Sequence, residues 1–216
     1  MFDINKYREI KENIDKNQLK SQIIAISKNH PKESVVYAIK QGVRIFGENR
    51  VIEAKNKFSK ILLEYPDVEL HLTGPLQSNK VKKAIDLFDV FHTIDREKIA
   101  NEISKYGDKL QNKKLFVQIN SGKETNKSGI YPEHLKDFLE YCFNEIKIKI
   151  EGLMCIPPID EKPSAHFQML RNLGEKNNLN LLSFGMSADY EEALLFNPTY
   201  IRLGTILFGV RKWSKS

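Results

Sequence analysis

Several polar residues stand at the ends of short apolar runs, where side chains from different runs can reach one ligand. Lys28 follows the run IIAIS at 23–27, Ser187 ends the run LLSFGMS at 181–187, and Gly204–Thr205 lies in YIRLGTILFG at 200–209. Hydroxyl groups and exposed backbone N–H groups bind phosphate. A lysine amine withdrawn from water can form a Schiff base. Together they indicate a phosphorylated aldehyde or ketone, either pyridoxal 5'-phosphate or a sugar phosphate.

Lys28 and Ser187 also have ordinary structural interpretations. Lys28 could be a solvated lysine at the rim of the fold. Ser187 could cap a helix whose first turn holds Asp189 and Glu191. Gly204, which lacks a side chain, lets a phosphate approach the backbone, and Thr205 adds a hydroxyl group. Because Lys28 follows an uninterrupted apolar run and the candidate phosphate ligands lie within two others, a shared ligand site is a real candidate.

Arg202 is expected to point into the interior of the fold. Strand alternation places it with Gly204 on one face and Ile201 with Leu203 on the other. A buried cation needs a partner, because burying an unpaired charge costs several kcal/mol. Two interpretations remain open, a structural ion pair with Glu48 or Glu151 and a contact with the ligand beside the phosphate.

The remaining reactive side chains give weaker signals. His71 and His92 lie within apolar runs and are expected to be hydrogen-bonded core residues rather than catalytic ones. Three further histidines are expected on the surface or on helices: His30, His134 and His166. Cys142 and Cys155 have no metal-ligand spacing, so we expect neither a zinc site nor a disulfide. No G-x-S-x-G signature is present.

These residues must be positioned by alternating strands and helices. The eight β-branched apolar runs lie at 23–27, 43–48, 68–74, 89–94, 114–120, 148–156, 181–187 and 200–209. Helical patterns follow them at 31–42, 48–60, 77–87, 95–106, 132–145, 163–177 and 188–195, and one more precedes them at 4–16. Asn49, Gly74, Asn120 and Met154 stand at or near the ends of further runs.

This alternation predicts a single α/β domain over residues 1–216, a (β/α)8 TIM barrel with an extra N-terminal helix. An open doubly wound sheet is the alternative, although its nucleotide-binding motifs are missing. In a barrel, functional side chains come from the C-terminal ends of the strands, and the loops after the seventh and eighth strands often hold a phosphate.

The composition excludes several classes of function. The 216 residues are 41% hydrophobic with a formal charge of +6, but the lysines are dispersed among acidic residues, which argues against nucleic-acid binding. The N-terminus MFDINKYREIKENIDKN is polar, and no run of 18 apolar residues occurs, so neither a secretory signal nor a membrane span is expected. We expect a cytoplasmic, monomeric protein.

Segments along the whole chain resemble the pyridoxal-phosphate homeostasis proteins (the YggS/PROSC family). They are SKNHP at 27–31, FGENR at 46–50, HLTGPLQSNK at 71–80, HTID at 92–95, KSGI at 127–130, GLMCIPP at 152–158, GMSADYEEAL at 185–194 and IRLGTILFG at 201–209. The resemblance implies a barrel similar to the N-terminal domain of alanine racemase that carries pyridoxal 5'-phosphate as an aldimine.

The resemblance also implies residue roles. Lys28 would carry the aldimine, and Ser187, Gly204 and Thr205 would hold the phosphate. Arg202 would meet the pyridine nitrogen, and Asn49 would lie beside the cofactor. We also expect Met154, at the end of the sixth run, to contact it. Lys127 resembles a second family lysine near the site, although it could equally be a solvated loop residue.

Three functions fit these expectations. A carrier would hold the cofactor and deliver it, with apoenzymes as transient partners. An amino-acid racemase would need bases on both faces of the substrate carbon, yet the sequence stops seven residues after Gly209, where the alanine racemase type continues into a β-domain. A phosphate-sugar aldolase would use the same Lys28 without a bound chromophore. Arg202 at the pyridine nitrogen would weaken the ring as an electron sink, which favours the carrier.

Overall fold

Eight parallel strands form one closed barrel in the computed structural model, which describes residues 2–209. The strands follow the chain in order, and β8 pairs with β1 to close the ring. They are β1 Gln22–Ile26, β2 Ile45–Glu48, β3 Glu69–Leu72, β4 Val90–Ile94, β5 Lys114–Ile119, β6 Gly152–Cys155, β7 Leu181–Met186 and β8 Tyr200–Leu203. The predicted barrel is confirmed, and the open sheet is excluded.

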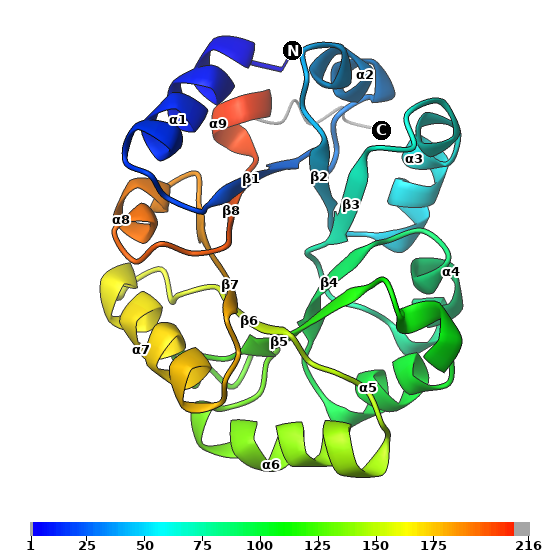
Figure 1. Ribbon diagram of the computed structural model, residues 1–216, viewed down its shortest axis with the longest axis vertical. Coiled ribbons are helices and arrows are strands. Elements are labelled where there is room, and N and C mark those ends of the chain that lie inside the picture. The colour runs from blue at the N-terminus through cyan, green and yellow to red at the C-terminus, as the bar shows by residue number, and fades with distance from the viewer. Residues whose placement is uncertain (1, 210–216) are drawn as a thin grey trace.

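Helices surround the strands (Figure 1). The α-helices are α1 Ile4–Lys16, α2 Lys32–Lys40, α3 Val51–Glu64, α4 Val81–Ile85, α5 Glu97–Ser104, α6 Leu135–Glu140, α7 Pro163–Lys176, α8 Tyr190–Leu194 and α9 Thr205–Phe208. Short 3-10 turns lie at Ser78–Lys80, Gly107–Leu110 and Pro132–His134, and a π-helical turn at Tyr141–Glu145 extends α6. The extra helix expected before the first strand is α1.

The strands are buried on both faces, as their continuous apolar runs predict. Outward side chains such as Ile23, Ala25 and Ile201 pack in a core between the strands and the helices. Inward side chains fill the barrel, where the fully or nearly fully buried apolar members are Ile24, Ile26, Val90, Phe116, Met154 and Tyr200. The barrel is therefore a packed interior rather than a pore, and a ligand site must lie at one of its ends.

The last predicted strand is shorter than expected. The run at 200–209 forms a strand only over Tyr200–Leu203, and Thr205–Phe208 is instead the one-turn helix α9. This turn lies beside α1, where the ring of Phe208 contacts that of Phe2 with centroids 5.0 Å apart. The Asp3 N–H also donates to the Leu207 carbonyl at 2.7 Å. Gly204 and Thr205 thus lie at the junction of strand and helix, not within the strand.

The two interior histidines are hydrogen-bonded core residues, as predicted. His71 Nδ1 and His92 Nε2 lie 2.9 Å apart, and His71 Nε2 lies 2.6 Å from Glu69 Oε1. His92 also stacks on Phe116 with ring centroids 4.8 Å apart. Burial is the main cause that lowers the pKa of both histidines, well below its ordinary value for His92. Both imidazoles are therefore neutral near pH 7.

Two further expectations concern residues 2–209 as a whole. No helix in this range combines the length and the apolar character needed to cross a membrane. No group of three or more histidine, cysteine or carboxylate side chains there has an arrangement that could hold a metal ion. Cys142 and Cys155 are both buried and unpaired with one another.

Candidate functional site

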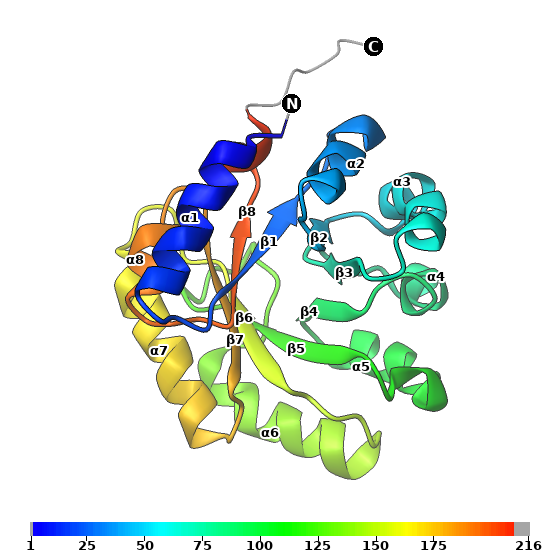
Figure 2. The same cartoon turned by 45° about the horizontal axis from the view of Figure 1, so that its top comes forward.

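A cavity of about 310 Å³ opens at the C-terminal ends of the strands. Figure 2 shows the arrowheads of β1 and β8 side by side at this end of the barrel. The cavity is lined by Ile26, Lys28, His30, Asn49, Thr73, Ile156, Met186, Ser187, Ala188, Arg202, Gly204, Thr205 and Gly209. Of the seven residues that the sequence singles out as cofactor ligands, six are among them. Its size is at the lower end of the range for small-molecule sites, roughly 300–1,000 Å³.

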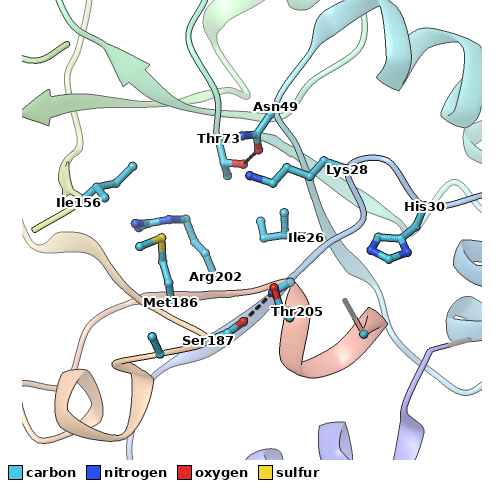
Figure 3. A pocket seen from close by; sticks show the side chains of 13 residues that line it. Ile26, Lys28, His30, Asn49, Thr73, Ile156, Met186, Ser187, Arg202 and Thr205 are labelled. Atoms are coloured by element: carbon cyan, nitrogen blue, oxygen red, sulfur yellow. Dashed lines mark hydrogen bonds between the residues drawn. The ribbon is translucent and has the colours of Figure 1, made fainter. Parts of the chain in front are cut away.

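Lys28 lies on the turn that follows β1, two residues beyond the last strand residue. The turn closes through a 3.0 Å hydrogen bond from the His30 N–H to the Ser27 carbonyl, with Asn29 in the left-handed region at φ 61°. Asparagine adopts that conformation more readily than most residues. The half-buried Lys28 side chain points into the cavity (Figure 3). A lysine on a solvated rim would point away from it.

The side of the cavity with convergent backbone donors is built where β7 and β8 end. Ser187 Oγ accepts hydrogen bonds from the Gly204 N–H at 3.2 Å and the Ile206 N–H at 3.3 Å. Two backbone donors therefore converge on one oxygen, with the side chain of Thr205 beside them (Figure 3). Such convergence is what an anion needs.

Ser187 does not cap the helix that follows it, so the alternative interpretation of this residue was wrong. The N-cap of α8 is Asp189, and its carboxylate accepts from the Met186 N–H. Asp189 therefore stands before the helix rather than in its first turn, which holds Glu191 and Glu192. The hydroxyl group of Ser187 is left to face the start of α9 and the cavity.

Arg202 is buried at 4% exposure and projects into the barrel interior, as strand alternation predicts. Its Nη1 donates to Ser183 Oγ at 2.8 Å and its Nη2 to the Cys155 carbonyl at 3.0 Å. Within residues 2–209 no carboxylate oxygen lies within 4.0 Å of a guanidinium nitrogen of Arg202. The proposed ion pairs were wrong, because Glu48 pairs with Lys57 at 2.7 Å and Glu151 with Lys149 at 3.3 Å.

Asn49 and Thr73 form the side of the cavity next to the C-terminal ends of β2 and β3. The Thr73 hydroxyl donates to Asn49 Oδ1 at 3.1 Å. Gly74 is required here, because an added Cβ would overlap the Asn49 backbone, including its Cα at 2.6 Å. The end of β3 therefore packs directly on the residue that the sequence places beside the ligand. Thr73 itself was missed, although its place at a strand end was the available signal.

Met154 does not line the cavity. It is completely buried in the barrel interior, beside Phe116 and Tyr200. Ile156, two residues further along, lines the cavity instead, together with Met186. Since β6 ends at Cys155, only side chains beyond that point reach the opening. Ile156 and Met186 supply the apolar surface that a planar ring would need.

Two further basic side chains differ in their relation to the cavity. His30, expected among surface or helix residues, lines the cavity and stacks on Phe208 with ring centroids 5.0 Å apart. Lys127 is absent from the lining, and its ammonium pairs with Glu124 at 2.7 Å while the side chain is 40% exposed. Its solvated-loop interpretation fits this placement.

The charge of the cavity is one-sided. Lys28 and Arg202 are among its lining residues, and no acidic side chain of the described chain is. A cavity with two cations, hydroxyl groups and backbone donors favours an anionic ligand. With the apolar surface of Ile156 and Met186, it fits a phosphorylated aromatic aldehyde of the kind that the sequence indicated.

Comparison with known proteins places this barrel in a family. Residues 4–212 match the family described as "Alanine racemase, N-terminal domain". The chain is 37% identical over 205 residues to the pyridoxal phosphate homeostasis protein of Aquifex aeolicus, covering 89% of this chain and 88% of the relative. It is 34% identical over 203 residues to that of Escherichia coli K12, covering 89% and 87%. The chain belongs to the pyridoxal phosphate homeostasis protein family.

Solved structures agree with this assignment to the pyridoxal phosphate homeostasis proteins. PipY of Synechococcus elongatus, solved without PLP, superimposes with a TM-score of 0.83 at 35% identity, covering 95% of this chain and 99% of PipY. The same protein has been solved with PLP bound, and that structure gives 0.81 at 34% identity over the same shares. Alanine racemase of Acinetobacter baumannii shares the fold at a TM-score of 0.70 and 17% identity, over 58% of that chain.

Proposed function

We propose that this protein binds pyridoxal 5'-phosphate in the cavity, bonds it covalently to Lys28, and holds and delivers it within the cell. The observation that carries the proposal is the joint placement of Lys28, Arg202 and the Ser187 oxygen around one cavity. Arg202 is a buried cation without a carboxylate partner in the described chain, so a ring nitrogen that accepts a hydrogen bond would give it a further partner.

The residues present fit this cofactor. The Gly204 and Ile206 N–H groups, which now converge on Ser187 Oγ, would hold the phosphate with the hydroxyl groups of Ser187 and Thr205. Arg202 would meet the pyridine nitrogen, and Asn49 would lie along the ring. When bound, pyridoxal phosphate supplies an aldehyde that condenses with a lysine amine, releasing water and forming a carbon–nitrogen double bond.

Holding the cofactor is favoured over turning over an amino acid. A guanidinium keeps its charge at neutral pH, so Arg202 would disfavour protonation of the pyridine nitrogen and weaken the ring as an electron sink. Racemisation also needs a base on each face of the substrate carbon. Apart from Lys28, the described lining residues include only His30 as a conventional general base, at the edge near Phe208.

The cellular setting completes the proposal. We propose a cytoplasmic, monomeric protein whose transient partners are apoenzymes that take up the released cofactor. Holding a reactive aldehyde as a reversible adduct would keep its free concentration low while leaving it available. Sedimentation of the purified protein, with and without pyridoxal phosphate, checks the monomeric state directly.

The test combines binding with turnover. Purified protein is mixed with pyridoxal phosphate, and the absorption band of the lysine adduct is titrated to a stoichiometry. The same sample is then assayed for racemisation of free amino acids by chiral chromatography. We expect one equivalent of adduct and no appreciable racemisation. An absent band would contradict cofactor binding through a lysine, and robust racemisation would contradict the carrier role.

A further inference from the structure

The turn that carries Lys28 is held by three charged side chains from neighbouring elements. Lys57 of α3 donates from Nζ to the Ser27 carbonyl at 2.7 Å. Glu48 at the end of β2 accepts from the Ser27 hydroxyl at 2.7 Å. Glu53 in the first turn of α3 accepts from the Asn29 N–H at 2.6 Å. The residues immediately before and after Lys28 are therefore both fixed by side chains.

The three charged residues also bind one another. Lys57 Nζ lies 2.7 Å from Glu48 Oε1 and 3.2 Å from Glu53 Oε1. One ammonium group thus joins two carboxylates that contact opposite sides of the lysine turn. Hydrogen bonds in which the donor or the acceptor is ionised are shorter and stronger than neutral ones. A shift of α3 relative to β1 would consequently move Lys28.

Two of the three charged side chains in this cluster are almost completely buried. Glu48 is fully buried and the Lys57 side chain is 7% exposed. The second Glu48 oxygen is buried without a hydrogen-bond partner within the described chain, and burial raises the pKa of this carboxyl group despite Lys57. Buried ion pairs often stabilise no more than apolar side chains of the same volume. Stability alone is a weak reason for such a cluster, whereas a fixed geometry at the turn is a specific one.

We propose that Lys57, together with Glu48 and Glu53, is a positioning residue that sets the place of the Lys28 amine in the cavity. This inference rests on the proposed function. The Lys28 amine adds to the aldehyde carbon, water leaves, and a carbon–nitrogen double bond forms. Lys57 takes no part in these bond changes, because it acts through the Ser27 carbonyl. Its effect is to hold the amine where the aldehyde of a phosphate-anchored ligand arrives.

The alternative is that the cluster only joins β1, β2 and α3. The two roles predict different effects of substitutions in the cluster. A purely structural joint would change the stability of the barrel and the binding of every cavity ligand together. A positioning role changes the reaction at the amine, while the phosphate contacts, which would come from the ends of β7 and β8 and the start of α9, stay intact.

The experiment measures two quantities on the full chain. One is the rate at which pyridoxal 5'-phosphate forms the borohydride-reducible adduct on Lys28. The other is the dissociation constant of pyridoxine 5'-phosphate, which has an alcohol in place of the aldehyde and cannot form the bond. Lys57→Met combined with Glu48→Gln removes both buried charges and leaves a neutral acceptor for Ser27. Glu53→Ala, at a side chain with 25% exposure, releases Asn29 and removes one of the two carboxylates that pair with Lys57, and it should fold in any case.

The matched control is Lys113→Met. This partly buried lysine also donates to a backbone carbonyl, that of Phe88 at 2.6 Å, but it precedes β5 at the opposite end of the barrel. It should leave both quantities unchanged. In the double variant we expect adduct formation to slow about tenfold or more while the affinity for pyridoxine phosphate changes by less than about twofold. Glu53→Ala should show the same pattern with a smaller effect.

Two results would overturn the inference. Variants that form the adduct at the wild-type rate would show that the turn needs no such anchoring. Variants in which the rate of adduct formation and the affinity for pyridoxine 5'-phosphate fall by the same factor would show that the cluster is a structural joint and that Lys57 is not a positioning residue. Should wild-type protein itself form no adduct on Lys28, the proposed function would fail, and that failure is visible before any variant is made.

Discussion

Arg202 is a buried cation that meets only a hydroxyl group and a backbone carbonyl in the described chain. Arg202→Met should therefore leave the thermal stability of the protein without ligand unchanged or slightly higher, since a desolvated charge is removed. Its affinity for pyridoxal phosphate should fall. A lost hydrogen bond to a charged group costs about 1.5–3 kcal/mol, roughly a ten- to hundredfold change. Equilibrium dialysis and thermal unfolding measure the two effects, and a large loss of stability would instead indicate a structural role.

Gly74 allows the closest backbone contact at the cavity. Gly74→Ala places a Cβ against the Asn49 backbone, so the end of β2 or β3 must shift. Overpacking of this kind costs about 1–3 kcal/mol in the free energy of unfolding, and we expect weaker cofactor binding as well. Gly107→Ala is the control, because its Cβ would meet no atom within 4 Å. Denaturant unfolding of both variants decides the point, and equal stabilities would contradict the close-packing account.

All the cofactor ligands expected from the sequence line the cavity except Met154, whereas some other lining residues were not expected. Lys28 and Ser187 were found because each stands at the end of an apolar run, and Arg202 was found because strand alternation turns it inward. Met154 was misplaced by two residues, since the position at which β6 leaves the barrel depends on tertiary packing. Thr73 was missed although it stands at a strand end, and Ile156 carries no chemical signal that separates it from ordinary strand-end residues.

The junction of β7, β8 and α9 places the phosphate donors. Ser187→Ala removes the acceptor of the Gly204 and Ile206 N–H groups, and we expect a loss of about 1 kcal/mol in unfolding free energy. Cofactor binding should weaken further, because the same hydroxyl group is a proposed phosphate ligand. Ser59→Ala, which removes an exposed hydroxyl group bonded to the Lys55 carbonyl, is the control. An unchanged dissociation constant in Ser187→Ala would remove this residue from the site.

Element boundaries were the least predictable part of the fold. The number and order of the strands followed from the alternation of apolar runs with helical patterns, yet TILF at 205–208 reads equally well as strand or helix. The structure makes it a helical turn because Leu207 and Phe208 pack beside the N-terminal segment, through Asp3 and Phe2. That contact joins the two ends of the described chain and is not visible in the local pattern.

The whole barrel should lose stability in mild acid because of its histidine pair. Burial lowers the folded-state pKa of His71 and His92, and Glu69 opposes this shift for His71 while Arg202 adds to it for His92. The unfolded chain therefore binds more protons below about pH 6.5, and stability falls as the pH drops through that range. The slope approaches about 1.4 kcal/mol per pH unit for each histidine.

A substitution of His92 isolates the contribution of this histidine to the pH dependence of stability. His92→Phe should reduce the pH slope of the unfolding free energy between pH 5 and 7 by roughly half, whatever its effect on absolute stability. His134→Gln, at an exposed position, should leave the slope as in the wild type. Urea unfolding at several pH values measures this slope. If His92→Phe has the same slope as the wild type, the acid sensitivity comes from other groups.

The most direct test of the proposed function asks which lysine holds the cofactor. Protein mixed with one equivalent of pyridoxal phosphate is reduced with borohydride and digested, and the labelled peptide is sequenced by mass spectrometry. We predict one label per chain, on Lys28, and its loss in Lys28→Ala. A label on Lys57 or Lys127 in the wild type, or full labelling that persists in Lys28→Ala, would contradict the account.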